Sequence, residues 1–240
     1  MGNTHATRAQ IELRRRIISG ELPGGTRLFE VQTAELLNIS RTPVRDAMSR
    51  LVEEGLLERA RGGGFLVRSF GLAEVIDAIE LRGVLEGTAA RLAAERGVAI
   101  AALARIRAIV DELDGCFKHQ TGEVDLGRYG ELNATFHKEL VALAGSTIIR
   151  REVERVTMLP FASPSAFLPD NAEIEAFSRS LEAAQDQHRQ IVAAIAGREG
   201  ARAEALAREH ARLARRNLDH ILGENRTLMK NLPFMALVKG

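Results

Sequence analysis

Residues 40–45 of this 240-residue chain read Ser40-Arg41-Thr42-Pro43-Val44-Arg45, and they open a predicted helix over residues 40–54. Ser40 suits the N-cap of that helix, and Pro43 is tolerated in its first turn. Arg41 and Arg45 are four residues apart, so both side chains point from one face. An exposed, basic first turn of this kind suits the major groove of DNA, where arginine pairs with guanine or holds phosphate. On its own, such a pair of arginines is also typical of an ordinary solvated helix face.

Two further helices and a hairpin accompany this stretch. Residues 8–19 and 30–37 are predicted to be helical. Short strands are predicted over residues 56–59 and 65–68, joined by the turn Arg61-Gly62-Gly63-Gly64. Three helices followed by a two-stranded hairpin form the winged helix-turn-helix arrangement, whose third helix projects toward DNA. We expect the other side of that third helix to supply the core through Val44, Met48 and Leu51.

The character of the chain changes near residue 70, where we place a domain boundary. Residues 1–70 form the predicted DNA-binding domain, and residues 71–240 form a second, all-helical domain. Helices are predicted over residues 72–96, 99–119, 125–144, 147–159, 173–198 and 201–222. The fold class is therefore mainly α, with a winged helix-turn-helix followed by an antiparallel all-α bundle.

Composition and charge narrow the function classes. Hydrophobic residues make up 45% and charged residues 27% of the chain, as in ordinary globular proteins, and no apolar run reaches membrane-spanning length. The single cysteine, Cys116, excludes an internal disulfide framework and fits a cytoplasmic location. Residues 1–70 hold 11 arginines and no lysine against 8 acidic residues, so the basic excess lies where a polyanion would dock.

Polar side chains occupy core positions on three predicted helices of the second domain. Asn133 and His137 fall inside the apolar stripe of helix 125–144, one turn apart. His188 takes a core position of the next long helix, and His210 lies between two leucines of the last one. Buried polar groups without partners cost about 1–3 kcal/mol, and sharing one divalent ion such as zinc or nickel would satisfy all three imidazoles. The alternative for any one of them is a core histidine with protein partners.

Arg82 is a second anomaly, because it falls on the buried side of helix 72–96. It either pairs with Glu86, four residues on, or binds the carboxylate of a ligand beside the metal. Tyr129 either adds a hydroxyl to the same cavity or packs in the core.

Two segments of the chain resemble known bacterial protein families. The stretch from Leu22-Pro23-Gly24 through residues 40–47, followed by residues 51–57, resembles the DNA-binding domain of GntR-family transcription regulators. The helical remainder is similar to the FCD effector-binding domain of the FadR-like subfamily. Its signature here comprises Glu80-Leu81-Arg82, Leu85-Glu86, Asn133, Phe136-His137, His188 and His210.

The resemblance implies specific site residues. DNA contacts would fall on Ser40, Arg41, Thr42, Arg45, Arg61 and Gly62. Many FCD domains bind metal through one aspartate and three histidines, which implies Asn133, His137, His188 and His210 here, with Asn133 in the aspartate position. An amide is a weaker ligand than a carboxylate. Relatives that sense organic or sugar acids favour the ligand-binding role of Arg82.

These observations predict a bacterial transcriptional regulator, a repressor in the commoner family pattern, rather than an enzyme. Its partners would be double-stranded operator DNA and a small carboxylate-containing metabolite, with no membrane. A homodimer is expected because a two-fold operator requires two recognition helices at a fixed spacing. The alternative function is a metal-dependent enzyme in the helical bundle. Against it, the sequence has no His-Glu-x-x-His pattern.

Overall fold

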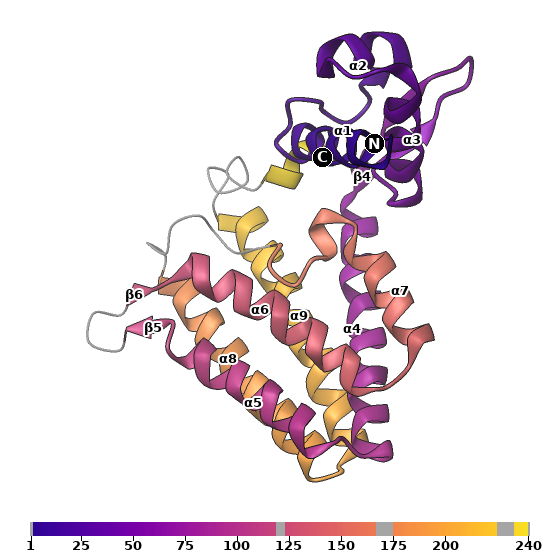
Figure 1. Ribbon diagram of the computed structural model, residues 1–240. Coiled ribbons are helices and arrows are strands. Elements are labelled where there is room, and N and C mark those ends of the chain that lie inside the picture. The colour runs from indigo at the N-terminus through magenta and orange to yellow at the C-terminus, as the bar shows by residue number, and fades with distance from the viewer. Residues whose placement is uncertain (1, 119–122, 167–174, 225–232, 240) are drawn as a thin grey trace. The chain divides into compact units, whose positions relative to one another are not determined.

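A computed structural model describes the whole chain except residues 1, 119–122, 167–174, 225–232 and 240 (Figure 1). The chain divides into two compact units. The first unit comprises Met1–Val75, Met158–Pro160 and Leu232–Gly240, and the second comprises Ile76–Thr157 and Phe161–Asn231. Helices predominate in both, so the predicted mainly α class is confirmed.

The first unit contains three helices and a small antiparallel sheet. The helices are α1 (Gly2–Ile18), α2 (Glu30–Leu37) and α3 (Arg41–Glu53). The sheet has the order β1-β3-β2, built from β1 (Arg27–Leu28), β2 (Leu57–Arg59) and β3 (Phe65–Val67). The predicted three helices and hairpin are present, and β1 is an additional strand that was not predicted because two residues are too few to show a pattern.

The core of the first unit lies between α1 and α3. Val44, Met48 and Leu51 are fully buried, as predicted, and Leu13 and Ile17 of α1 are fully buried as well. An ion pair fastens the two helices, since Arg14 Nε donates to Glu54 Oε2 at 3.0 Å. With one face of α3 buried against α1, its opposite face is exposed.

The C-terminal residues of the chain also belong to this unit. The short helix η2 (Pro233–Leu237) packs against α1, and β7 (Val238–Lys239) pairs in parallel with β4 (Phe70–Gly71). Leu237 is buried. The predicted second domain, residues 71–240, included residues 233–239, because position along the chain is the only guide that the sequence offers there.

The second unit is a bundle of helices (Figure 1). Its elements are α4 (Leu72–Arg96), α5 (Ile100–Asp114), α6 (Leu126–Leu143), α7 (Thr147–Thr157), η1 (Pro160–Ala162), α8 (Glu175–Ala196) and α9 (Gly200–Glu224). The helix predicted over residues 99–119 ends earlier, at Asp114. Strand β5 (Phe117–Lys118) takes its place and pairs with β6 (Glu123–Val124). Residues 173–174 of another predicted helix lie outside the described residues. Within the described part of the chain, no helix is both long and apolar enough to cross a membrane.

Two glycines of α4 bring this helix close to α9. A Cβ atom at Gly83 would lie 2.8 Å from the Cβ of Ala211, and one at Gly87 would lie 2.7 Å from Cγ of Arg208. Real Cβ atoms do not approach so closely, so only glycine permits this packing. The close contact places Arg82 and Glu86 of α4 beside His210 of α9.

Candidate functional site

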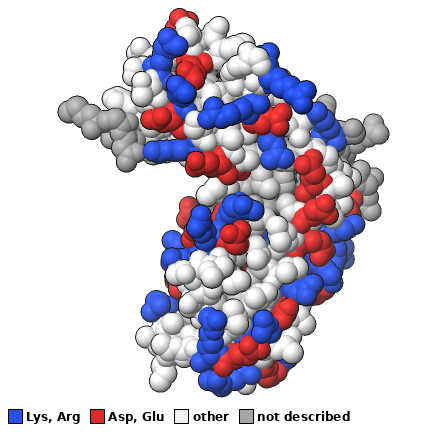
Figure 2. All heavy atoms as spheres, turned by 90° about the vertical axis from the view of Figure 1, so that its right-hand side faces the viewer, with Lys and Arg blue, Asp and Glu red and all other residues white. Residues whose placement is uncertain are grey.

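The start of α3 and the hairpin turn present the predicted DNA-contacting residues. All six of them (Ser40, Arg41, Thr42, Arg45, Arg61 and Gly62) are exposed. Asn38 has a left-handed φ of 51°, which makes the tight turn from α2 into α3. Arg45 is 63% exposed and lies in a loose pair with Glu30, with 3.6 Å between Nε and Oε1. Figure 2 shows basic side chains interleaved with acidic ones on the face of this unit turned to the viewer.

The hairpin turn, here called the wing, depends on glycine and on Arg27. Gly62, Gly63 and Gly64 have φ values of 85°, 94° and 79°, a region that favours glycine. Arg27 Nη2 donates to the carbonyl oxygens of Arg61 at 3.0 Å and Gly63 at 2.8 Å. These bonds fix the wing backbone and leave the Arg61 side chain exposed. Arg27 was missed, because nothing in the sequence distinguishes it from other arginines.

Three buried histidines meet inside the second unit, one each from α6, α8 and α9. His210 Nε2 lies 3.1 Å from His188 Nε2 and 3.3 Å from His137 Nε2. One nitrogen from each ring lies within 4.8 Å of those from the other two. We call these residues the histidine cluster. The sequence predicted all three, and the structure brings them together.

Each ring of the histidine cluster has a separate oxygen partner at Nδ1. Glu86 Oε1 lies 3.0 Å from His137 Nδ1, and Gln185 Oε1 lies 3.0 Å from His188 Nδ1. Gln187 Oε1 lies 3.2 Å from His210 Nδ1. With the Nδ1 atoms turned to these partners, the Nε2 atoms of His137 and His188 both face Nε2 of His210. Gln185 and Gln187 were not predicted, although Gln185 is a polar residue one helical turn before His188 on the same buried face.

Burial and neighbouring charges shift the pKa values of His188, His210 and Glu86. Burial, together with the other rings, lowers the pKa of His188 well below its usual value and that of His210 to about 3. Burial opposes the charged form of Glu86, but His137 and Arg82 outweigh it and lower the Glu86 pKa to about 2. The two tuned imidazoles are therefore neutral, which is the state that binds metal ions.

Arg82 is buried and only partly paired. Its Nη1 donates to the Ala162 carbonyl oxygen at 3.3 Å, and its Nε lies 4.0 Å from Glu86 Oε2. The Nε atom has no hydrogen-bond partner among the described residues. Burial lowers the Arg82 pKa, while the charge of Glu86 raises it. Of the two roles considered for Arg82, the pair with Glu86 is present but long, which leaves donor capacity unused.

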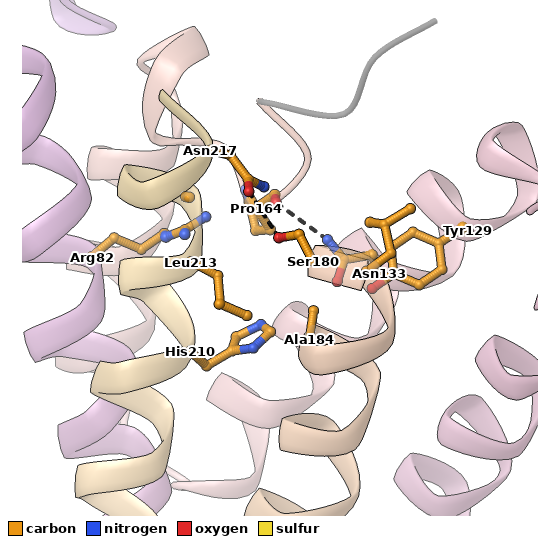
Figure 3. A pocket seen from close by; sticks show the side chains of 11 residues that line it. Arg82, Tyr129, Asn133, Pro164, Ser180, Ala184, His210, Leu213 and Asn217 are labelled. Carbon is orange, nitrogen blue, oxygen red and sulfur yellow. Dashed lines mark hydrogen bonds between the residues drawn. The ribbon is translucent and has the colours of Figure 1, made fainter. Parts of the chain in front are cut away.

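Arg82 lines a small cavity of about 40 Å³ together with Tyr129, Asn133 and His210 (Figure 3). Figure 3 shows Arg82 entering from one side, with Tyr129 and Asn133 on the opposite side. Asn133 Nδ2 donates to the Pro164 carbonyl oxygen and to Ser165 Oγ, both at 3.3 Å. Tyr129 is buried, and burial raises the pKa of its hydroxyl. The predicted effector residues and two of the predicted metal ligands thus line one cavity.

A larger cavity of about 410 Å³ lies between α6 and α7. Glu86 and His137 line it together with Lys138, Arg150 and Thr157. The Glu86–His137 pair therefore borders both this space and the histidine cluster. Nothing in the sequence pattern indicated this second cavity.

Comparison with known proteins gives matches to both units. Residues 77–213 match the FCD domain, and residues 6–67 match the family described as "Bacterial regulatory proteins, gntR family". The Nta operon transcriptional regulator of Aminobacter aminovorans is 34% identical over 133 residues, which cover 55% of this chain and 60% of that protein. The probable D-xylose utilization operon transcriptional repressor of Paenarthrobacter nicotinovorans is 31% identical over 165 residues, covering 65% and 69%.

The solved structure of McbR/YncC from Escherichia coli has a similar fold. It superposes with a TM-score of 0.62 at 20% identity, and the match covers 91% of this chain and 97% of that one. At this identity the likeness concerns the fold alone.

Proposed function

Because the chain belongs to the GntR family of bacterial regulatory proteins and carries the FCD domain, we propose that it is a repressor controlled by a small carboxylate metabolite. Like the members of its family and the relatives named above, the chain is a DNA-binding transcriptional regulator. It is not an enzyme. The finer proposal concerns which residues contact operator DNA, which hold a metal ion, and which bind the effector. The repressor role follows the name of one relative, and the site of action is the cytoplasm, where the chromosome lies.

DNA recognition is assigned to the exposed start of α3 and to the wing. Arg41 and Arg45 read base edges in the major groove, and the hydroxyls of Ser40 and Thr42 bind phosphate oxygens. The Gly62 backbone approaches the phosphates without a side chain, with Arg61 beside it. The observation that carries this assignment is that all six residues are exposed while the opposite face of α3 is fully buried.

The histidine cluster has the donor chemistry of a divalent metal site. Zn–N bonds of about 2.0–2.1 Å in tetrahedral geometry place neighbouring nitrogen ligands about 3.3–3.4 Å apart, and the two Nε2 separations of 3.1 and 3.3 Å lie close to that value. His137, His188 and His210 would hold the ion, and Asn133 would complete the set with its amide oxygen. When bound, the ion supplies a Lewis-acidic centre that attracts a carboxylate. The outward Nδ1 contacts support this assignment over a purely hydrogen-bonded cluster.

The effector site is assigned to the small cavity beside the cluster. Arg82 offers an unused donor to a carboxylate, and Tyr129 offers a hydroxyl. A volume of about 40 Å³ holds about three water molecules, so a larger organic acid requires the lining residues to move apart. An effector that selects such a widened arrangement shifts the population of conformations. Because α4 carries Arg82 and its first residues, 72–75, group with the DNA-binding unit, this helix is the proposed route of coupling.

The protein is proposed to act as a homodimer. Operators of this class of regulator are two-fold sites, and one recognition helix occupies only one half-site. Two copies at a fixed spacing double the contact area and read the full operator. Sedimentation of the free protein and of its DNA complex measures the stoichiometry, and one copy per operator would contradict the proposal.

A binding experiment tests the DNA assignment. Duplex fragments from the genomic neighbourhood of the gene are mixed with the protein at fixed salt, since affinity for DNA depends strongly on salt. Binding of at least one fragment by the wild type, and its loss in the Arg41→Ala, Arg45→Ala double variant, is the expected result. Equal binding by the double variant would reject the assignment.

A release experiment tests the effector and metal assignments. In a screen of small organic acids with Zn²⁺ present, the wild type should release its operator with at least one acid. Arg82→Met should bind DNA normally but fail to respond, whereas Arg105→Met, which changes an exposed arginine of α5, should respond fully. His188→Ala should lose Zn²⁺ by elemental analysis. Circular dichroism confirms that each variant is folded, and an unchanged response of Arg82→Met would contradict the effector role.

A further inference from the structure

Gln185 is a fully buried polar side chain behind the histidine cluster. It lies on α8 one turn before His188, with an exposed fraction of 1%. Gln185 is not a member of the histidine cluster, and it does not line the small cavity beside Arg82. Its amide makes three hydrogen bonds, all of them with other protein groups.

The orientation of this amide is fixed by two acceptors. Gln185 Nε2 donates to the Val110 carbonyl oxygen at 2.8 Å and to Asp114 Oδ1 at 2.7 Å. Neither a carbonyl nor a carboxylate oxygen has a proton to donate, so only the NH₂ end of the amide fits there. Both of its protons are thereby used. The Oε1 end must face His188, and an amide oxygen can only accept.

This arrangement determines where His188 carries its proton. Because Gln185 Oε1 lies 3.0 Å from His188 Nδ1, the proton of the neutral ring belongs on Nδ1. The Nε2 atom is then left with a free lone pair, and it is Nε2 that faces His210 at 3.1 Å. We infer that Gln185 is a positioning residue, which holds His188 in the one tautomer that can offer Nε2 to a metal ion. The metal part of this inference rests on the function proposed above.

The acceptors that fix Gln185 are themselves held in place. Val110 lies within α5, so its carbonyl oxygen has a fixed direction. Asp114, at the end of α5, is paired with Arg189, whose Nε donates to Asp114 Oδ2 at 3.3 Å. A chain of bonds thus runs from a surface ion pair through Gln185 to His188. On the opposite side, Glu86 does the same for His137 with a charged oxygen, so the two histidines are aligned by different chemistries.

Nitrogen NMR on the metal-free, full-length protein tests this inference directly. With ¹⁵N-labelled histidine, the two ring nitrogens of His188 have different shifts according to which one carries the proton. The wild type should show His188 protonated on Nδ1. Gln185→Met, which keeps the side-chain length but removes the acceptor, should show a mixture of tautomers. Gln190→Met makes the same change on the same helix at a residue whose amide donates to Asp186, and it should match the wild type.

Zinc affinity gives the second measurement. Removing an outer partner of a metal-bound histidine typically weakens binding by about 10–100-fold, so Gln185→Met should lose affinity for Zn²⁺ alone by that factor in competition with a chelator. Gln190→Met should not.

The outcomes separate this inference from the proposed function. A wild-type His188 protonated on Nε2, or a Gln185→Met variant with unchanged tautomers, overturns the role of Gln185 even if zinc binds. Weaker zinc binding with unchanged tautomers assigns Gln185 a packing role and also overturns it. If the wild type binds no zinc, the proposed metal site fails, while the tautomer result still decides what Gln185 does.

Discussion

Arginine serves opposite purposes in the two units. Arg41 and Arg45 are exposed on the first turn of α3, where a binding partner can contact their side chains. Arg82 is 2% exposed, and its Nε atom has no hydrogen-bond partner among the described residues. In the first unit, the buried face of α3 supplies the core, and its opposite face carries the residues proposed to contact DNA. In the second unit, Arg82, His188 and His210 are buried in the bundle and also belong to the proposed binding sites.

The largest expected effect concerns pH and the second unit. His188 and His210 have lowered pKa values in the folded, metal-free protein, whereas an unfolded chain protonates histidine near pH 6.5. Below that pH the unfolded state binds more protons, so stability falls as the pH falls toward the folded values. Between pH 7 and pH 5, His210 alone costs about 2 kcal/mol, and His188 adds to this loss in the same direction. Denaturant titrations with chelator at several pH values measure this loss.

A variant isolates the contribution of one ring. His188→Leu removes one of the two groups with a lowered pKa, so the loss of stability between pH 7 and pH 5 should become smaller than in the wild type. If the variant keeps the full pH dependence of the wild type, the buried histidines are not its source, and the contrast between the units weakens.

The intermediate effect concerns DNA affinity and the first unit. Arg41→Ala and Arg45→Ala should each weaken operator binding by about 1–3 kcal/mol and change folding stability by less than about 0.5 kcal/mol. Arg105→Ala is a matched control, because Arg105 and Arg45 are both 63% exposed and both lie in loose ion pairs. It should leave DNA affinity unchanged. Fluorescence anisotropy at fixed salt and thermal unfolding measure the two quantities, and equal effects of Arg45→Ala and Arg105→Ala would show general electrostatics instead.

The smallest expected effect is on folding stability, and it concerns Ser40 at the start of α3. Ser40 occupies the N-cap of α3, yet its side chain makes no capping hydrogen bond. Ser40→Ala should therefore cost less than about 0.5 kcal/mol of folding stability. Asp125→Ala should cost about 1 kcal/mol, since the Asp125 side chain caps α6 by accepting from the Arg128 backbone at 3.0 Å. A larger loss for Ser40→Ala than for Asp125→Ala, measured by denaturant unfolding, would contradict this reading of the caps.

The sequence was most informative where a local pattern is repeated along a helix. The amphipathic stripes predicted α3 and its core, and the polar residues inside the stripes of α6, α8 and α9 predicted the histidine cluster. The partners of that cluster were out of reach. Gln185 bonds to Asp114, which lies 71 residues away, and Glu86 bonds to His137, which lies 51 residues away. Such pairings depend on how helices far apart in the sequence pack together, and no local pattern along a single helix predicts that packing.

The pairing of β7 with β4 has a consequence for genetics. Segments far apart in the chain belong to one structural unit, since η2 packs against α1 and Val238 aligns with Phe70. Missense alleles in the codons for residues 233–239 should therefore group in a phenotypic screen with missense alleles of residues 2–70, and not with alleles of the helical bundle that separates them on the map.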